Sequence, residues 1–89
     1  MVRIFVRHPV TDYSHWRTAY DAFDAVRQHM GVTGQGVYRG VDDPNDVTVW
    51  HDFASAEQAK AFAASDELRH AMDEAGVAGP PAVWFVTPA

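Results

Sequence analysis

The segment Asp46–Phe53, with the sequence DVTVWHDF, limits most strongly what this chain can fold into. Side chains of a strand alternate between the two faces of a sheet, and here both faces are largely apolar. One face carries three apolar side chains and one histidine, namely Val47, Val49, His51 and Phe53. The opposite face carries Trp50. A strand of this kind needs a covering layer on each side, so the sequence predicts two packing partners for its sheet.

The first half of the chain is typical of a strand, a helix and a second strand. Residues 2–8 are rich in β-branched and aromatic side chains, which favour a strand. A helix begins at Thr11 or Asp12, whose side-chain oxygens can cap it, and continues to a stop at Gly31. Residues 36–41 form a strand that leads through a turn containing proline and asparagine back into the DVTVWHDF strand.

The second half of the chain predicts two short helices and a last strand. Ser55 and Gln58 have the spacing of a capping box, with Ser55 as N-cap. Ser65 opens a further short helix that Gly76 stops. Residues 82–87, with the sequence AVWFVT, form a strand that is again apolar on both faces.

These elements predict one α+β domain spanning residues 1–89, with the ferredoxin-like order β-α-β-β-α-β and an antiparallel sheet covered by helices on one side. The uncovered face then holds Phe5, Trp50 and either Trp84 or Phe85. Three aromatic side chains make a larger apolar patch than soluble monomers usually expose. We therefore expect a homodimer that packs sheet against sheet into an α+β barrel.

Composition excludes several classes of function. The formal net charge of −5 leaves no basic patch for phosphates, so we expect no nucleic-acid partner. The chain has no cysteine, which excludes disulfides, thiolate metal sites and a cysteine nucleophile. No apolar run is long enough for a membrane span, and no signal peptide is evident. We expect a cytoplasmic protein with no membrane partner.

The stretch VTVWHDFASAEQAKAFAASDEL resembles the third strand and the following helices of the antibiotic-biosynthesis-monooxygenase-like, dimeric α+β barrel superfamily. The shared features are the apolar strand, an acid beside an aromatic at Asp52 and Phe53, and the helix starts at Ser55 and Ser65. The element order extends the resemblance over nearly the whole chain. The resemblance implies a ligand cavity between sheet and helices. Members include cofactor-free monooxygenases acting on polycyclic aromatics, polyketide cyclases, muconolactone isomerases, haem-degrading enzymes and uncharacterised small proteins.

His51 is the candidate catalytic residue, because it interrupts the otherwise apolar strand face that we assign to the helix side. The resemblance places it in the cavity wall. There, a buried neutral imidazole can accept a proton from a phenol or an enolisable carbonyl. The alternative is a core histidine that a backbone or tyrosine partner satisfies. His8 shares the face in the first strand, but antiparallel pairing places it near Val47, so we expect no direct pair between the two histidines.

An aromatic stripe on the first helix is the candidate ligand wall, although such a stripe is more often core than binding site. Tyr20 and Tyr38 carry hydroxyl groups that can donate to a ligand oxygen. Trp50 is assigned to the dimer interface instead. The predicted ligand-binding residues are Trp16, Tyr20, Phe23, Tyr38, Val49, Phe62 and Met72.

We predict neither a metal site nor a bound cofactor. His15 and His29 lie about 21 Å apart along one helix and cannot share an ion. His70 falls off the apolar stripe of its helix and should be exposed. Haem-degrading members of the superfamily use a helix histidine that aligns with Met72 here, and many members have a histidine where this chain has Leu68. The missing helix histidine argues against haem degradation, and acid/base roles that depend on a histidine at position 68 do not carry over to this chain.

The leading hypothesis is therefore a dimeric barrel that binds a small apolar or aromatic molecule in each subunit. It acts as a cofactor-free monooxygenase or as a polyketide cyclase or isomerase, with His51 as acid/base. The alternative is a non-catalytic ligand-binding or structural homodimer. A haem protein ranks last.

Overall fold

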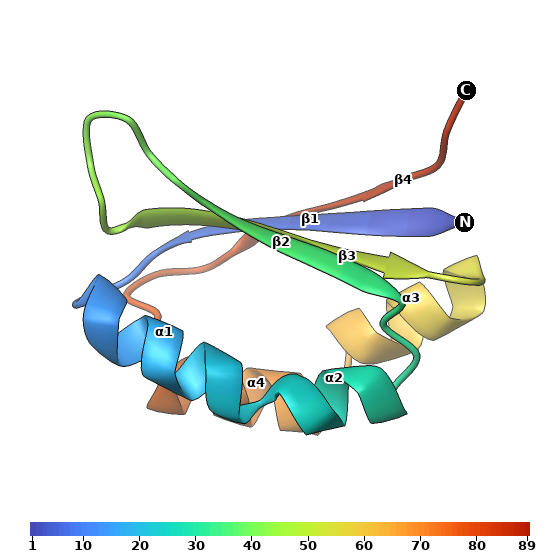
Figure 1. The fold of residues 1–89 in the computed structure, drawn as a ribbon, viewed down its shortest axis with the longest axis horizontal. Helices are drawn as coiled ribbons and strands as arrows, with labels where there is room; N and C mark the ends of the chain where they lie inside the picture. Colours follow the sequence, from blue (N-terminus) through green and yellow to red (C-terminus); the bar gives the residue numbers. More distant parts are fainter.

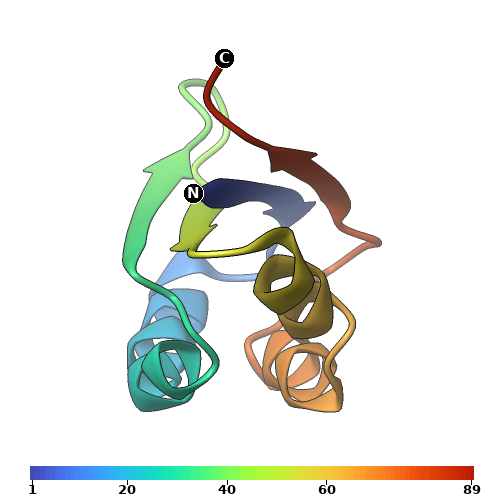
Figure 2. The same ribbon diagram turned by 90° about the vertical axis from the view of Figure 1, so that its right-hand side faces the viewer.

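The computed structural model describes residues 1–89 as a four-stranded antiparallel sheet with all of its helices on one face (Figures 1 and 2). The strands lie in the order β2-β3-β1-β4. The elements along the chain are β1 (Val2–Pro9), α1 (Tyr13–Ala22), α2 (Asp24–His29), β2 (Gly34–Arg39), β3 (Asp46–Phe53), α3 (Ala56–Ala63), α4 (Asp66–Glu74) and β4 (Ala82–Val86). This arrangement confirms the ferredoxin-like α+β fold expected from the sequence.

Helix ends lie close to where the sequence predicts them. Asp12 caps α1 by accepting from the backbone N–H of Ser14, and Ser55 caps α3 by accepting from Gln58. Ser65 caps α4 in the same way. Gly76, with φ of 80°, takes the left-handed conformation that ends α4.

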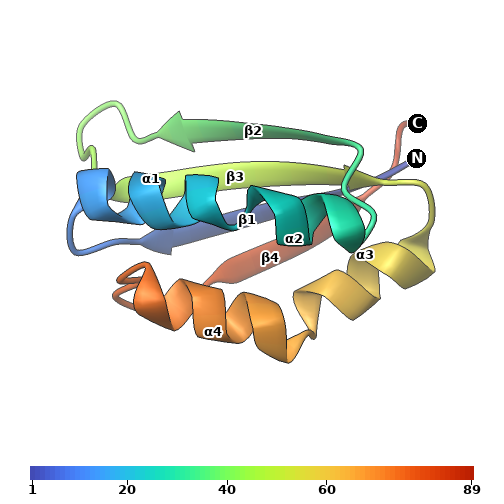
Figure 3. The same ribbon diagram turned by 60° about the horizontal axis from the view of Figure 1, so that its bottom comes forward.

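One predicted helix is in fact two, because the chain breaks at Phe23 (Figure 3). The backbone N–H of Phe23 donates to both Ala19 and Tyr20, which tightens the last turn of α1. The Tyr20 carbonyl also accepts from the side chain of Arg27 at 2.6 Å. The expectation of one continuous helix up to Gly31 was therefore wrong, because a side chain takes part in satisfying the backbone at the break.

The sheet register places three aromatic side chains in one row on the uncovered face. Phe5 pairs with Trp50 on β3 and with Trp84 on β4. Phe85 pairs with Ile4 and faces the helices instead, which resolves the alternative left open by the sequence. The first hairpin strand also ends earlier than predicted, at Arg39, and Val41 is fully exposed.

The core lies between the sheet and the helices. Its ten buried apolar residues come from β1, β3, α1, α3, the β1–α1 connection and the C-cap of α4. They are Ile4, Val6, Val10, Trp16, Val47, Val49, Phe53, Ala59, Phe62 and Ala75. Strand β4 contributes none of them, because all five of its residues are exposed. The layer is thus well filled under β1 and β3 and open under β4. None of the helices is long and apolar enough to cross a bilayer.

Candidate functional site

A small cavity of about 50 Å³ lies between the strands β1 and β3 and the helices α1 and α4, and we call it the inner cavity. Its wall is mostly apolar, with four polar side chains among fourteen lining residues: His8, Tyr20, Arg27 and His51. The apolar lining residues are Val6, Trp16, Ala19, Phe23, Val49, Phe62, Leu68, Ala71, Met72 and Ala75. A volume of this size holds a few water-sized groups and not a whole organic ligand.

Tyr20 and His51 form a hydrogen-bonded pair in the wall of this cavity. Oη of Tyr20 lies 3.2 Å from Nε2 of His51, and their rings are nearly parallel. The pair joins α1 to β3. Trp16 stacks on Tyr20, with ring centroids 4.8 Å apart. Phe62 meets the His51 ring edge-on from α3.

His51 is held as a neutral imidazole. Only 3% of the residue is exposed, and burial together with the nearby Arg27 charge lowers the pKa of His51 to about 4. Burial also raises the pKa of Tyr20, so the phenol keeps its proton at neutral pH. The second ring nitrogen of His51, Nδ1, is buried and has no hydrogen-bond partner. The pair therefore leaves one polar atom unused, which is unusual for a core histidine.

His8 lines the same inner cavity at the other end of the strand face. It pairs with Val47 and not with His51, so no direct histidine pair forms, as the sequence predicted. It is buried, with 3% of the residue exposed. Burial lowers the pKa of His8, and its Nδ1 likewise has no hydrogen-bond partner. Two neutral imidazoles with free nitrogen atoms thus contribute to one cavity.

Arg27 is the polar residue of the inner cavity that sequence reasoning missed. Its side chain is 2% exposed, and its guanidinium carbon lies 3.7 Å from the centre of the Tyr20 ring. The guanidinium donates to the Tyr20 carbonyl, to Oε1 of Gln35 and to a carboxylate oxygen of Asp24. The apolar stripe predicted for this helix includes Val26 and not Arg27. In the structure Arg27 is the buried residue of α2, which begins just after the break at Phe23.

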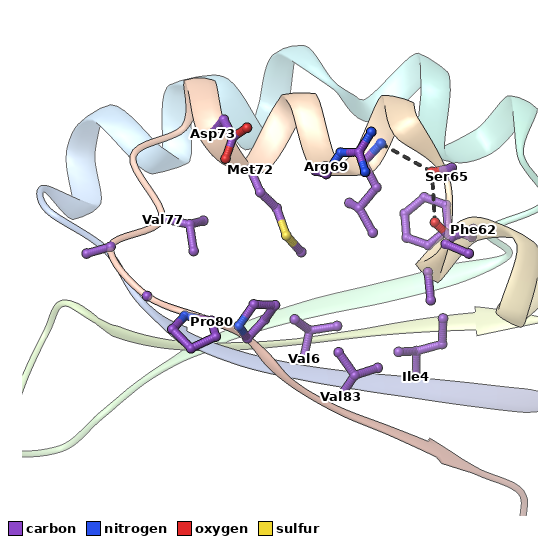
Figure 4. Close-up of a pocket in the computed structure, with 16 residues that line it drawn as sticks. Ile4, Val6, Phe62, Ser65, Arg69, Met72, Asp73, Val77, Pro80 and Val83 are labelled. Carbon is purple, nitrogen blue, oxygen red and sulfur yellow. Dashed lines mark hydrogen bonds between the residues drawn. The ribbon is translucent and has the colours of Figure 1, made fainter.

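A much larger hollow lies beside the inner cavity, and we call it the outer groove (Figure 4). It has a volume of about 620 Å³ and lies between β1 and β4 on one side and α3 and α4 on the other. Arg69 and Asp73 of α4 and the segment 77–81 also line it. The groove exists because β4 is not covered by helices. Its volume falls in the range of small-molecule binding sites.

Four side chains belong to both hollows and separate them: Val6, Phe62, Leu68 and Met72. Figure 4 shows Met72 extending from α4 toward the strands. Methionine has three rotatable side-chain bonds and adapts easily to a changed neighbour. The same four side chains thus face the outer groove on one side and the inner cavity on the other.

Six of the seven predicted ligand-binding residues line the inner cavity, and their role in binding stays a prediction: Trp16, Tyr20, Phe23, Val49, Phe62 and Met72. Tyr38 does not. It lies on β2 opposite Thr48, on the uncovered face, and is 61% exposed. The expectation that Tyr38 reaches this cavity was wrong, because its neighbour Val37 occupies the helix-facing position of β2.

The uncovered face keeps the features that suggested a dimer. Trp50 lies there under the guanidinium of Arg3, whose central carbon is 4.0 Å from the indole centre. Arg3 also forms a two-pronged ion pair with Asp52. Trp84 remains 48% exposed. On α4, His70 is exposed as predicted. No group of three or more His, Asp or Glu side chains is arranged to hold a metal ion.

Neither a family model nor a curated protein matches this sequence, but solved structures do. A Bordetella bronchiseptica protein named for antibiotic biosynthesis monooxygenases superposes with a TM-score of 0.84 at 14% identity, over 99% of this chain and 96% of that one. SnoaB from Streptomyces nogalater, described as a cofactor-independent oxygenase, gives 0.80 at 12% identity, over 99% and 92%.

The monooxygenase ActVA-Orf6 of Streptomyces coelicolor, solved with nanaomycin D, gives a TM-score of 0.71 at 20% identity, over 99% of this chain and 87% of that one. At these identities the likeness concerns the fold. The chain has the fold of antibiotic-biosynthesis-monooxygenase-like proteins, which confirms the resemblance noted in its sequence.

Proposed function

We propose that this protein binds a small apolar or aromatic molecule between its sheet and helices and converts it without metal or organic cofactor. The reaction is a monooxygenation, or a cyclisation or isomerisation of the polyketide type. The observation that carries the proposal is the buried Tyr20–His51 pair, which leaves Nδ1 of His51 unpaired in a cavity wall. The names of SnoaB and ActVA-Orf6, which share the fold, support the monooxygenase form.

We propose that the ligand occupies both hollows, and their volumes support this. The outer groove has room for a ring system, whereas the inner cavity has room only for a polar group at its end. A ligand lying in the groove reaches the Tyr20–His51 pair once Met72 and Leu68 move aside. The apolar lining then excludes water from the reacting end of the ligand.

His51 is the acid/base residue in this proposal. A neutral imidazole takes the proton of a phenol or of a carbon next to a carbonyl, and Tyr20 holds the ring in place through Nε2. The resulting phenolate or enolate is a carbon nucleophile, which either closes a ring or reacts with dioxygen. In the second case one oxygen atom enters the product as a quinone carbonyl and the other leaves as water. The substrate supplies all four electrons that reduce dioxygen, and two of its hydrogen atoms leave in the water.

Turnover of hydroxylated naphthalenes under ¹⁸O₂, followed by mass spectrometry, tests the monooxygenase form. We expect a quinone that carries one labelled oxygen, with no added metal or flavin. His51→Gln should lower the rate by about 10²–10⁴-fold, the range that general bases contribute. Tyr38→Phe is the matched control and should keep the wild-type rate. Wild-type turnover by His51→Gln contradicts the role of His51.

A non-catalytic ligand-binding dimer is the second candidate. It is favoured by the small volume of the inner cavity. The Tyr20 ring already stacks on Trp16 and is hydrogen-bonded to His51, so little room is left for a substrate. In that case ligands bind in the outer groove and no product forms. Binding without turnover across a panel of phenols and enolisable ketones distinguishes this candidate from the first.

We further propose that the protein is a homodimer that packs through its uncovered sheet face. The row formed by Trp50, Phe5 and Trp84 runs across three neighbouring strands. It is apolar at its centre, while ion pairs of Arg3 with Asp52 and of Arg7 with Asp46 lie toward its edges. An apolar centre with a charged rim is the usual composition of a protein interface.

A further inference from the structure

The wall of the inner cavity contains one charged side chain, that of Arg27. No aspartate or glutamate is among its fourteen lining residues. His8 and His51 are neutral at pH 7, and Tyr20 keeps its proton. Arg27 is thus the only ionised side chain in the wall. A buried charge acts over a longer range than an exposed one, because little water screens it.

The positive charge of Arg27 is balanced by a carboxylate on one side only. Its only ionic partner, Asp24, accepts through one oxygen at 3.2 Å and is 42% exposed. The same carboxylate also accepts from Gln28 and from Gln35. The negative charge is therefore shared among several donors and lies toward solvent. One face of the guanidinium is covered by the Tyr20 ring and not by a carboxylate.

From this arrangement we infer that the ligand carries an acidic hydroxyl group, a phenol or an enol, and that this group binds in the inner cavity as the anion. Arg27 supplies the stabilising charge. Nδ1 of His51, once it has taken the proton of the ligand, donates a hydrogen bond to the resulting oxyanion, and Nδ1–H of His8 donates a second. The inference rests on the proposed function and narrows it to one class of ligand. An amine or another cation is excluded from the site by the same charge.

Among the charged groups near the inner cavity, Arg27 is the one that can give the site a preference for anions. From α1, Arg17 also lies over Tyr20, at 5.6 Å, but it is exposed and paired with Asp21. The helices α3 and α4 contribute only apolar side chains to the inner cavity. The strands contribute the two histidines. A purely structural Arg27 would hold the α1–α2 break in place and leave the ionisation of a bound ligand unchanged.

The test compares two probes of similar shape, 4-nitrophenol and nitrobenzene, by absorbance titration of the full-length protein. The phenol ionises near neutral pH and turns yellow as the anion. We expect the pKa of 4-nitrophenol to fall when it binds. We also expect its anion to bind at least about tenfold more tightly than nitrobenzene. Equal binding of the two probes, with an unshifted ionisation, overturns the inference and leaves the proposed function standing. Binding of neither probe contradicts the proposed function itself.

Three variants identify the source of the charge. Arg27→Met should abolish the preference for the anion, while Arg17→Met, the matched control on α1, should keep it. Because Arg27→Met also removes three hydrogen bonds, its folding is checked by circular dichroism. Arg27→Lys keeps the positive charge but lacks the planar guanidinium and its contacts. It should retain most of the preference for the anion. An unchanged preference in folded Arg27→Met, or its loss in Arg17→Met, contradicts the assignment to Arg27.

Discussion

Oη of Tyr20 lies 3.2 Å from Nε2 of His51, and this contact joins the first helix to the central region of the sheet. Replacing Tyr20 with phenylalanine leaves both ring nitrogens of a buried histidine without a protein partner. We expect Tyr20→Phe to lower the free energy of unfolding by about 1–3 kcal/mol. Urea denaturation measures this loss. The exposed Tyr38→Phe should change it by less than about 0.5 kcal/mol, and an equal effect of both variants would show that the contact is not stabilising.

The pH dependence of stability follows from His51. Its pKa is about 4 in the folded protein and close to 6.5 in the unfolded chain. The unfolded chain therefore binds more protons between these values, so stability is complete above about pH 6.5 and falls as the pH drops toward 4. The loss attributable to His51 is at most about 3 kcal/mol. His8, whose pKa is also lowered, acts in the same direction.

Urea midpoints measured from pH 4 to pH 8 check this expectation. His51→Gln should show a shallower decline than the wild type over the acidic half of the range. His70→Gln, at an exposed position of α4, controls for the removal of a histidine as such. Parallel curves for the wild type and His51→Gln would mean that His51 is not held neutral by the fold.

Gly36 and Trp50 face each other on neighbouring strands, and a methyl group at position 36 would overlap the indole nitrogen. Gly36→Ala should therefore displace Trp50 and destabilise the protein by about 1–3 kcal/mol, as overpacking does elsewhere. Gly34→Ala is the control on the same strand, because its methyl group would lie 3.5 Å from Asp52, at ordinary contact distance. The denaturation midpoints of the two variants should differ clearly. Equal midpoints would contradict the close packing of Trp50 on β2.

The proposed dimer depends on the aromatic row of the uncovered face. Trp84 is half exposed on the edge strand, so Trp84→Glu should leave the single chain folded and prevent association. Light scattering after size exclusion should give twice the chain mass for the wild type and one chain mass for the variant. Val41→Glu, in an exposed turn, is the matched control and should remain dimeric. A wild-type monomer would contradict the proposal.

Much of the fold could be predicted from the local pattern of the sequence. The DVTVWHDF strand has the predicted bounds. The alternation of its side chains and the turn residues beside it predict the same strand ends. The caps at Ser55 and Ser65 were identified from the residues that follow them in the sequence. The ferredoxin-like topology followed from the order of the elements.

The features that were missed depend on contacts between distant residues. Arginine is rarely buried, so nothing in the local sequence around Arg27 indicates that it turns inward at a break in the helix. The outer groove arises because the edge strand β4 receives no helical cover, which periodicity does not reveal. Tyr38 was assigned to the wrong face because the sequence gives two adjacent packing residues, Val37 and Tyr38, of which only one can face the helices.

The central claim is that a small aromatic molecule binds between sheet and helices, and the three methionines allow a direct measurement. Met72 lines both hollows, whereas Met1 and Met30 line neither. NMR spectra of protein labelled with ¹³C at the methionine methyl groups, titrated with 2-naphthol, should show a saturable shift of the Met72 signal and constant Met1 and Met30 signals. A Met72 signal that does not move, or a shift confined to Met1 at the edge of the uncovered face, would contradict the account.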